Sequence, residues 1–199
     1  PTRRSSDLLP YSQKQHKPFK IERHSEYDKV VLVTQGTVEK DVNKIIVPTL
    51  EAFKNTNTLV IATTGGNGTS ELKKKYPQHN FIIEDFIPFG DILPVCDVYI
   101  TNGGYGGVML GIQNKVPMVV AGLHEGKNEI CARVGYFKLG INLETEKPTI
   151  EQIRKAVNEV AKKSDYKKNV TNLSNEFLRY EPTALLEKYM NELDSVRMN

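Results

Sequence analysis

The sequence predicts an α/β fold built on an open, doubly wound sheet of parallel strands. Short β-branched runs recur along the chain, and each would place apolar side chains on both faces, as in a parallel sheet covered by helices on both sides. Segments of helical spacing lie between these runs, and this alternation favours parallel βαβ units. Gly- and Thr-rich segments follow five of the runs, at the places where open α/β sheets bind their ligands.

Six strands are predicted from the apolar runs, the last from a weaker pattern than the others. They cover residues 30–33, 58–62, 81–83, 98–100, 118–120 and 140–143.

The helices are predicted from apolar positions that recur every three or four residues. A stripe from Val42 to Phe53 predicts the first helix, which Pro48 should kink or restart. The second helix should be capped by Thr69 or Ser70, because a hydroxyl can accept a hydrogen bond from a free backbone N–H. The remaining helices are predicted over residues 70–76, 108–113, 129–136, 149–160, 165–179 and 183–193, and the last three form a helical tail.

Length and composition exclude several classes of protein. With 199 residues and 39% apolar content, the chain can bury the core of a single domain. A net charge of +3 without a basic stripe argues against a nucleic-acid partner. No apolar run approaches the ~20 residues that span a bilayer, and no signal peptide is visible. Cys96 and Cys131 are therefore expected to be free thiols, in a cytoplasmic protein.

Residues 1–28 are predicted to be a leader or interdomain linker, and residues 29–199 to be the folded domain with its helical tail. Residues 1–8 resemble a translated sequencing-adapter scar, so they are excluded from the fold prediction.

The segment Asn102-Gly103-Gly104-Tyr105-Gly106-Gly107 predicts a ligand site, since it joins a buried strand to a helix. Glycines let the backbone approach a ligand closely, and the free N–H groups of a helix N-terminus favour an anion such as a phosphate or diphosphate. The alternative is a tight turn whose glycines satisfy steric needs alone. Further polar loops follow the other strands, over residues 34–37, 63–68, 86–90 and 122–127, and the last of these contains His124. Neither the dinucleotide-binding glycine pattern nor a P-loop is complete.

Residues 29–193 resemble the C-terminal, donor-binding half of UDP-glycosyltransferase-like enzymes, which include the UDP-glucuronosyl, plant secondary-product and macrolide transferases. The most specific part runs from Asp97 to Val119: an aspartate, a buried strand, a Gly-Gly-aromatic-Gly turn, a helix and Val-Pro-Met. Phe86-Ile87-Pro88-Phe89 and Thr34-Gln35-Gly36-Thr37 match two further loops of the family. The resemblance implies a Rossmann-like sheet that forms the C-terminal half of the two-domain GT-B architecture.

The resemblance also implies roles for residues of the site. Phe86 would stack on the nucleobase, and the Ile87 backbone would hydrogen-bond the edge of the base. Thr37 and the turn of Gly104, Tyr105, Gly106 and Gly107 would contact the diphosphate, chiefly through the Gly106 and Gly107 amides.

Three departures from the family pattern concern the donor. Asn102 stands where the family has a phosphate-binding histidine, and its amide can donate a hydrogen bond but carries no charge. Phe89 and Leu110 stand where a Gln and a Glu usually bind the ribose. The acidic–Gln pair that binds the sugar aligns with Gly126-Lys127, and Glu125 and Asn128 lie nearby as substitutes.

The resemblance therefore predicts the donor-binding half of an inverting glycosyltransferase, which uses a UDP-sugar or dTDP-sugar and needs neither a cofactor nor a metal. The catalytic base and the acceptor site would lie on an N-terminal half that this sequence does not contain, so the chain alone should be inactive. A non-catalytic nucleotide-binding module and an epimerase-like domain remain as alternatives.

Overall fold

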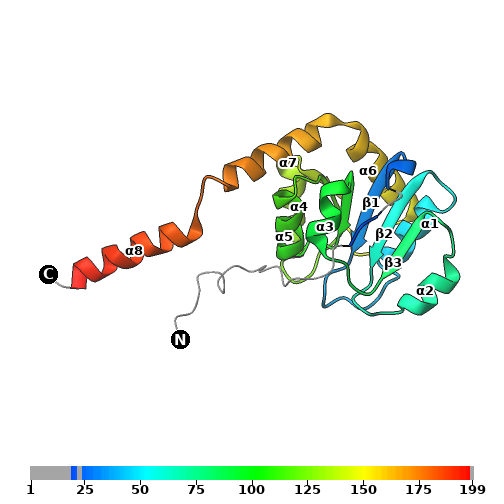
Figure 1. The fold of residues 1–199 in the computed structure, drawn as a ribbon, viewed down its shortest axis with the longest axis horizontal. Coiled ribbons are helices and arrows are strands. Elements are labelled where there is room, and N and C mark those ends of the chain that lie inside the picture. The colour runs from blue at the N-terminus through cyan, green and yellow to red at the C-terminus, as the bar shows by residue number, and fades with distance from the viewer. Residues whose placement is uncertain (1–18, 22–23, 198–199) are drawn as a thin grey trace. The chain divides into compact units, whose positions relative to one another are not determined.

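In the computed structural model, which describes residues 19–21 and 24–197, six parallel strands form one sheet (Figure 1). The order across the sheet is β3-β2-β1-β4-β5-β6, and every neighbouring pair is parallel. The strands are β1 (Lys29–Thr34), β2 (Thr58–Thr63), β3 (Phe81–Glu84), β4 (Val98–Thr101), β5 (Met118–Val120) and β6 (Gly140–Asn142). The doubly wound sheet predicted from the sequence is confirmed.

Eight α-helices and two short 3₁₀ helices are described in residues 24–197. They are η2 (His24–Glu26), α1 (Ile46–Phe53), α2 (Thr69–Lys75), α3 (Phe89–Ile92), η3 (Leu93–Val95), α4 (Tyr105–Gln113), α5 (Lys127–Tyr136), α6 (Ile150–Lys162), α7 (Ser164–Phe177) and α8 (Pro182–Arg197).

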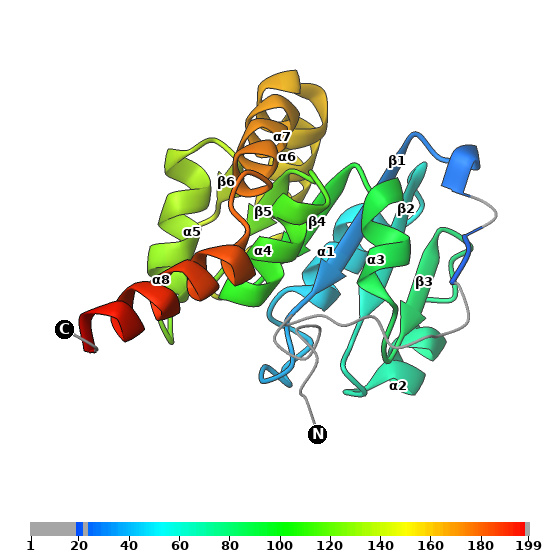
Figure 2. The same ribbon diagram turned by 60° about the vertical axis from the view of Figure 1, so that its left-hand side comes forward.

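Helices cover both faces of the sheet (Figures 1 and 2), and an apolar cluster lies on each face. One cluster joins the sheet to α1 and α6, and the other joins it to α3, α4, α5 and the first part of α7. In β1, Val31 and Val33 belong to the first cluster, while Val30 and Leu32 belong to the second. Because successive strand residues point to opposite faces, a continuous apolar run such as this one is buried on both sides.

Two details of the predicted helices are wrong. α1 begins at Ile46, so Val42 and Ile45 lie in the preceding turn and Pro48 falls in the first helical turn, where an N–H has no helical acceptor anyway. The N-cap of α2 is Gly68 in the left-handed conformation, with φ of 68°, and no side chain of Thr69 or Ser70 caps the helix.

Residues 19–174 form one compact unit, and the described residues 175–197 belong to a second. The unit includes part of the predicted linker: the Phe19 backbone N–H donates to Asp91 at 2.8 Å, and Ile21 and Tyr27 pack against the core. Residues 1–18, including the adapter-like segment, lie outside the described residues. Among the residues that the structure describes, no helix is long and apolar enough to cross a membrane.

Candidate functional site: the carboxyl edge of the sheet between β1 and β4

The sheet has a switch point between β1 and β4, where the chain changes the side of β1 on which it adds strands. β2 and β3 are added on one side of β1, and the chain then returns to place β4 on the other side. In open α/β sheets, ligands bind at such a switch point, beyond the carboxyl ends of the strands. Since every strand is parallel, the polar loops after β1, β3, β4 and β5 all leave the sheet at this edge.

The connections after β1 and β4 are in direct contact. The Asn102 side-chain nitrogen donates a hydrogen bond to the Gln35 carbonyl, and Gly36 lies close enough that a Cβ there would be 3.4 Å from the same nitrogen. The amide of Asn102 has a second hydrogen, which this bond leaves available. Asn102 therefore joins the two loops of the switch point and still offers one donor.

Helix α4 begins at this point. Its N-cap is Gly104, whose N–H donates to the Asn102 side-chain oxygen at 3.3 Å, and its first residue, Tyr105, is 68% exposed. The N–H groups of Tyr105, Gly106 and Gly107 lie in the first turn, where a helix provides no carbonyl acceptor. Together with the helix dipole they form a place that favours an anion.

Two glycines of this turn also satisfy steric requirements. Gly103 has φ of 73°, and a Cβ on it would overlap the Sγ of Cys131. A Cβ on Gly107 would lie 3.1 Å from both the Thr101 hydroxyl and the Tyr99 hydroxyl. The steric explanation of the glycine cluster thus holds at these two positions, and it does not exclude an anion at the N–H groups of the first turn of α4.

Gln35 has a role that the sequence did not reveal. Its buried side chain accepts hydrogen bonds from the N–H groups of Ile45 at 2.9 Å and Ile46 at 3.1 Å, and it donates to the Asp41 carbonyl at 2.8 Å. It therefore caps α1 from the end of β1. Thr37, two residues further on, is exposed in the turn at the edge.

The connection after β3 combines one exposed aromatic residue with buried ones. Phe86 is 74% exposed, whereas Ile87 is buried in the core. Phe89 and Leu110, which replace polar residues of the family pattern, both pack against the same apolar cluster as Ile87. In the sheet, β2 and β1 separate β3 from β4.

The loop after β5 ends in a charged pair at the start of α5. Glu125, with φ of 59°, and Gly126, with φ of 77°, turn the chain into the helix. Lys127 Nζ lies 2.6 Å from the Glu125 carboxylate, and the lysine side chain is the more buried of the two. His124 is exposed.

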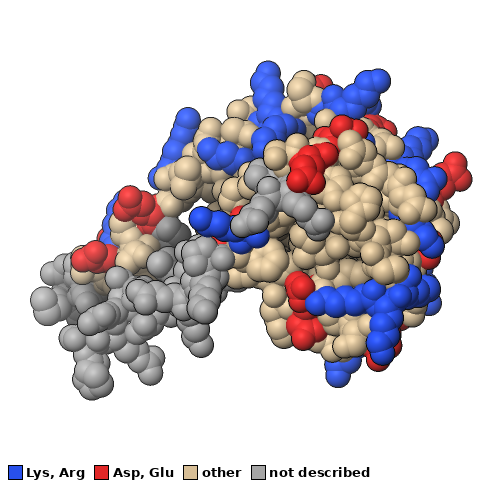
Figure 3. Space-filling model, turned by 45° about the vertical axis from the view of Figure 1, so that its right-hand side comes forward, with Lys and Arg blue, Asp and Glu red and all other residues tan. Residues whose placement is uncertain are grey.

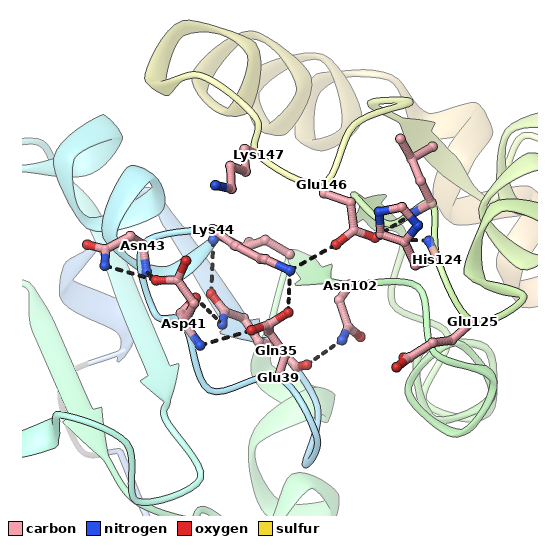
Figure 4. Close-up of polar contacts among 12 residues, drawn as sticks. Gln35, Glu39, Asp41, Asn43, Lys44, Asn102, His124, Glu125, Glu146 and Lys147 are labelled. Carbon is pink, nitrogen blue, oxygen red and sulfur yellow. Dashed lines mark hydrogen bonds and ion pairs between the residues drawn. The ribbon is translucent and has the colours of Figure 1, made fainter.

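A cluster of charges that the sequence reasoning missed crosses this edge. Lys44 reaches between Glu39, at 2.5 Å, and Glu146, at 3.2 Å, and Figure 4 shows it spanning the two carboxylates near Asn102. Burial raises the pKa of Glu146, but hydrogen bonds from the N–H groups of Leu123 and His124, together with Lys44, outweigh it and lower the pKa to about 2. No spacing in the sequence signals this cluster, because its charged members lie on two separate connections and the N–H groups that Glu146 accepts lie on a third.

Charges of both signs are scattered over the face drawn in Figure 3, around a broad uncharged area. This pattern agrees with the mixed charge of the sequence and shows no extended basic face in that view.

Comparisons with known proteins identify the family. The model of the erythromycin biosynthesis protein CIII-like C-terminal domain matches residues 48–191, which is most of the chain. The chain belongs to this family. A 4'-demethylrebeccamycin synthase of Lentzea aerocolonigenes is 36% identical over 148 residues, covering 74% of this chain and 34% of the relative. UDP-glucosyltransferase 1 of Beauveria bassiana is 34% identical over 162 residues, covering 80% and 35%. The chain thus spans about a third of the length of these relatives.

Solved structures show the same fold. The glycotransferase of kitacinnamycin matches with a TM-score of 0.79 at 21% identity, over 92% of this chain and 47% of that one. CalG4, the calicheamicin glycosyltransferase, matches with a TM-score of 0.77 at 22% identity, over 89% and 46%. The resemblance to UDP-glycosyltransferase-like proteins and the assignment to the C-terminal half of the GT-B architecture are confirmed.

Proposed function

We propose that this domain binds the nucleotide-sugar donor of an inverting glycosyltransferase, with UDP as the nucleotide. The observation that carries the proposal is the N-terminus of α4 at the switch point between β1 and β4, where Asn102 joins the two loops. The names of relatives such as UDP-glucosyltransferase 1 support UDP over dTDP. The acceptor and the catalytic base belong to the rest of the transferase, and the cytoplasmic location stays a prediction.

The strand order suggests how the donor lies along the edge. Phe86 follows β3 and would stack on the base, with the Ile87 backbone at the edge of the base. The α4 N-terminus follows β4, and its amides and Thr37 would hold the diphosphate. The Glu125–Lys127 pair follows β5 and would face the sugar. Base, phosphates and sugar would then follow one another along the carboxyl edge.

The reaction would use this half of the enzyme for the leaving group. A base on the N-terminal half takes the proton of the acceptor hydroxyl, and the hydroxyl oxygen forms a bond to the anomeric carbon from the side opposite the nucleotide. The bond between that carbon and the diphosphate oxygen breaks, and the departing diphosphate takes the electron pair. The α4 N-terminus would lie beside the diphosphate and would stabilise the charge that develops on it.

One observation favours a second candidate, a nucleotide-binding module without catalysis. Phe89 and Leu110 pack against the apolar core at the two positions where the family binds the ribose, so neither offers a polar contact there. If the complete protein binds a nucleotide but transfers no sugar, the second candidate is correct. The epimerase-like alternative has no observation of its own in the structure.

A titration tests the proposed function. UDP and dTDP are added to the ¹⁵N-labelled chain, and amide shifts are followed; we expect them to change in the loops after β1, β3 and β4. Phe86→Ala should weaken UDP binding by about 1–3 kcal/mol, the usual contribution of stacking between a base and an aromatic ring. Tyr136→Ala is the matched control, since Tyr136 is 82% exposed but lies at the far end of α5. Shift changes confined to other regions would contradict the proposal.

A further inference from the structure

Glu146 fixes the backbone of a loop to which it does not belong. It lies between β6 and α6, and one of its carboxylate oxygens accepts hydrogen bonds from the N–H groups of both Leu123, at 2.7 Å, and His124, at 3.0 Å. Its side chain is only 17% exposed. A charged oxygen that accepts two backbone N–H groups holds them more firmly than a neutral acceptor would.

The second oxygen of Glu146 ties this loop to the opposite side of the switch point. It binds Lys44 Nζ, which also binds Glu39, and both of these residues lie between β1 and α1. β4 lies between β1 and β5 in the sheet, so the ion cluster links connections on both sides of the one that follows β4 (Figure 4). One carboxylate thus joins connections on both sides of the edge at which the donor is proposed to bind.

The loop that Glu146 holds has little freedom of its own at one end and an unusual backbone at the other. A Cβ on Gly122 would overlap the Asn102 carbonyl oxygen, so the loop begins in close contact with the connection after β4. It ends with Glu125 and Gly126, both with positive φ, just before Lys127. A left-handed non-glycine residue persists only when its surroundings fix it, and Glu146 supplies contacts to Leu123 and His124, the two residues just before Glu125.

We infer that Glu146 is a positioning residue: held by Lys44, it fixes the loop from Leu123 to Lys127 so that the Glu125–Lys127 pair meets the sugar of the donor. This inference rests on the proposed function. Glu146 itself is not proposed to contact the donor. Replacing Glu146 should therefore weaken the binding of the sugar and not that of the nucleotide.

The test compares the dissociation constants of UDP and UDP-glucose, measured by calorimetry with the full chain. Glu146→Ala should weaken UDP-glucose binding about tenfold and UDP binding less than about twofold, so the ratio of the two constants changes. Glu146→Gln should lie in between, because its side-chain oxygen can still accept the two N–H groups while the ion pair with Lys44 is lost. Lys44→Met, which leaves Glu146 bonded to the loop, should change the ratio in the same direction and by less.

Glu129→Ala is the matched control, since it removes an exposed pair with Arg133 on α5, outside the loop, and should leave the ratio unchanged. A general loss of structure would weaken the binding of both ligands alike. A ratio of the two dissociation constants that stays the same in all the Glu146 and Lys44 variants therefore overturns the inference. The proposed function would still stand in that case, provided that the wild type binds UDP. A wild type that binds neither ligand contradicts the proposed function, and the inference falls with it.

Discussion

Gly103 is the residue where backbone conformation and packing restrict the side chain together. Its φ of 73° favours glycine, and a Cβ there would overlap the Sγ of the buried Cys131. The two restrictions have separate energetic costs. A residue with a side chain in the left-handed conformation costs ~1 kcal/mol, and overpacking a core costs ~1–3 kcal/mol.

We therefore expect Gly103→Ala to lower the free energy of unfolding by about 2–4 kcal/mol, measured by urea denaturation. Gly66→Ala is the matched control, because Gly66 has φ of 84° but nothing within 4 Å of a Cβ. It should cost only the backbone part, ~1 kcal/mol. Equal losses of unfolding free energy in the two variants would show that the Cys131 side chain moves aside without cost. The contact between Cys131 and a Cβ at position 103 would then be unimportant.

Glu146 should give the stability of the domain a pH dependence. Its pKa in the folded protein is about 2, below the ordinary value of 4.5, so the folded state favours the charged form. The stability that it contributes is present above about pH 4.5 and is lost as the pH falls toward 2.

We expect wild type to exceed Glu146→Gln in free energy of unfolding at pH 7, by at most about 3 kcal/mol, and the difference to shrink between pH 4.5 and 2. Denaturant midpoints at pH 7, 4 and 3 measure this, with Glu129→Gln as a control for loss of an exposed carboxylate. A difference that stays constant across this range would contradict the depressed pKa.

Among the elements, the strands and most of the α-helices could be predicted from the sequence, whereas the caps of α1 and α2 and the short helices η2, α3 and η3 could not. β1 and β2 are continuous apolar runs, and burial on both faces leaves few alternatives for such runs. Thr149 and Gln152 form a capping box at α6, where the sequence indicated a helix start. The cap of α1 was missed because it comes from Gln35, which only the folded chain brings to the helix.

The candidate site divides in the same way. The glycine turn before α4 could be predicted, because the glycines, the strand and the helix are adjacent in sequence. The contact between Lys44 and Glu146 could not, because it depends on which connections become neighbours after folding. Phe89 and Leu110 stand out in the sequence as departures, and only the structure shows that they share one apolar cluster.

A prediction about α1 follows from its cap. Gln35→Ala removes the acceptor of two buried backbone N–H groups, at Ile45 and Ile46, and each buried group left unsatisfied costs ~1–3 kcal/mol. We expect a loss of about 3 kcal/mol or more in the free energy of unfolding. Thr149→Ala removes an exposed cap of α6 and should cost only ~1 kcal/mol, so thermal or urea denaturation of both variants compares them directly. Similar losses of unfolding free energy in the two variants would mean that water or the turn before α1 bonds the backbone groups in place of Gln35.

For the whole molecule, the decisive fact is that the chain matches about a third of the length of its relatives. A transferase must orient an acceptor and a base against the donor, and such orientation supplies ~7–11 kcal/mol of barrier lowering. We expect the 199-residue chain, mixed with UDP-glucose and phenolic or alcoholic acceptors, to form no glycoside above background, as measured by chromatography. Product that is formed by this chain and lost on His124→Ala would make His124 the base and overturn the expectation.

The order of the strands also bears on how the domain is made. β1 is central, and Val31 gains its second neighbour, Val98, only when β4 is present. Two hydrogen bonds join Val30 of β1 to Asp97, the residue just before β4. The Asp97 N–H donates to the Val30 carbonyl, and the Asp97 carboxylate accepts the Val30 N–H at 2.8 Å. Before β4 emerges from the ribosome, β1 to β3 can pair only as a half-sheet with an open apolar edge, a template for aggregation. Synthesis that stalls between β3 and β4 should therefore yield insoluble chains.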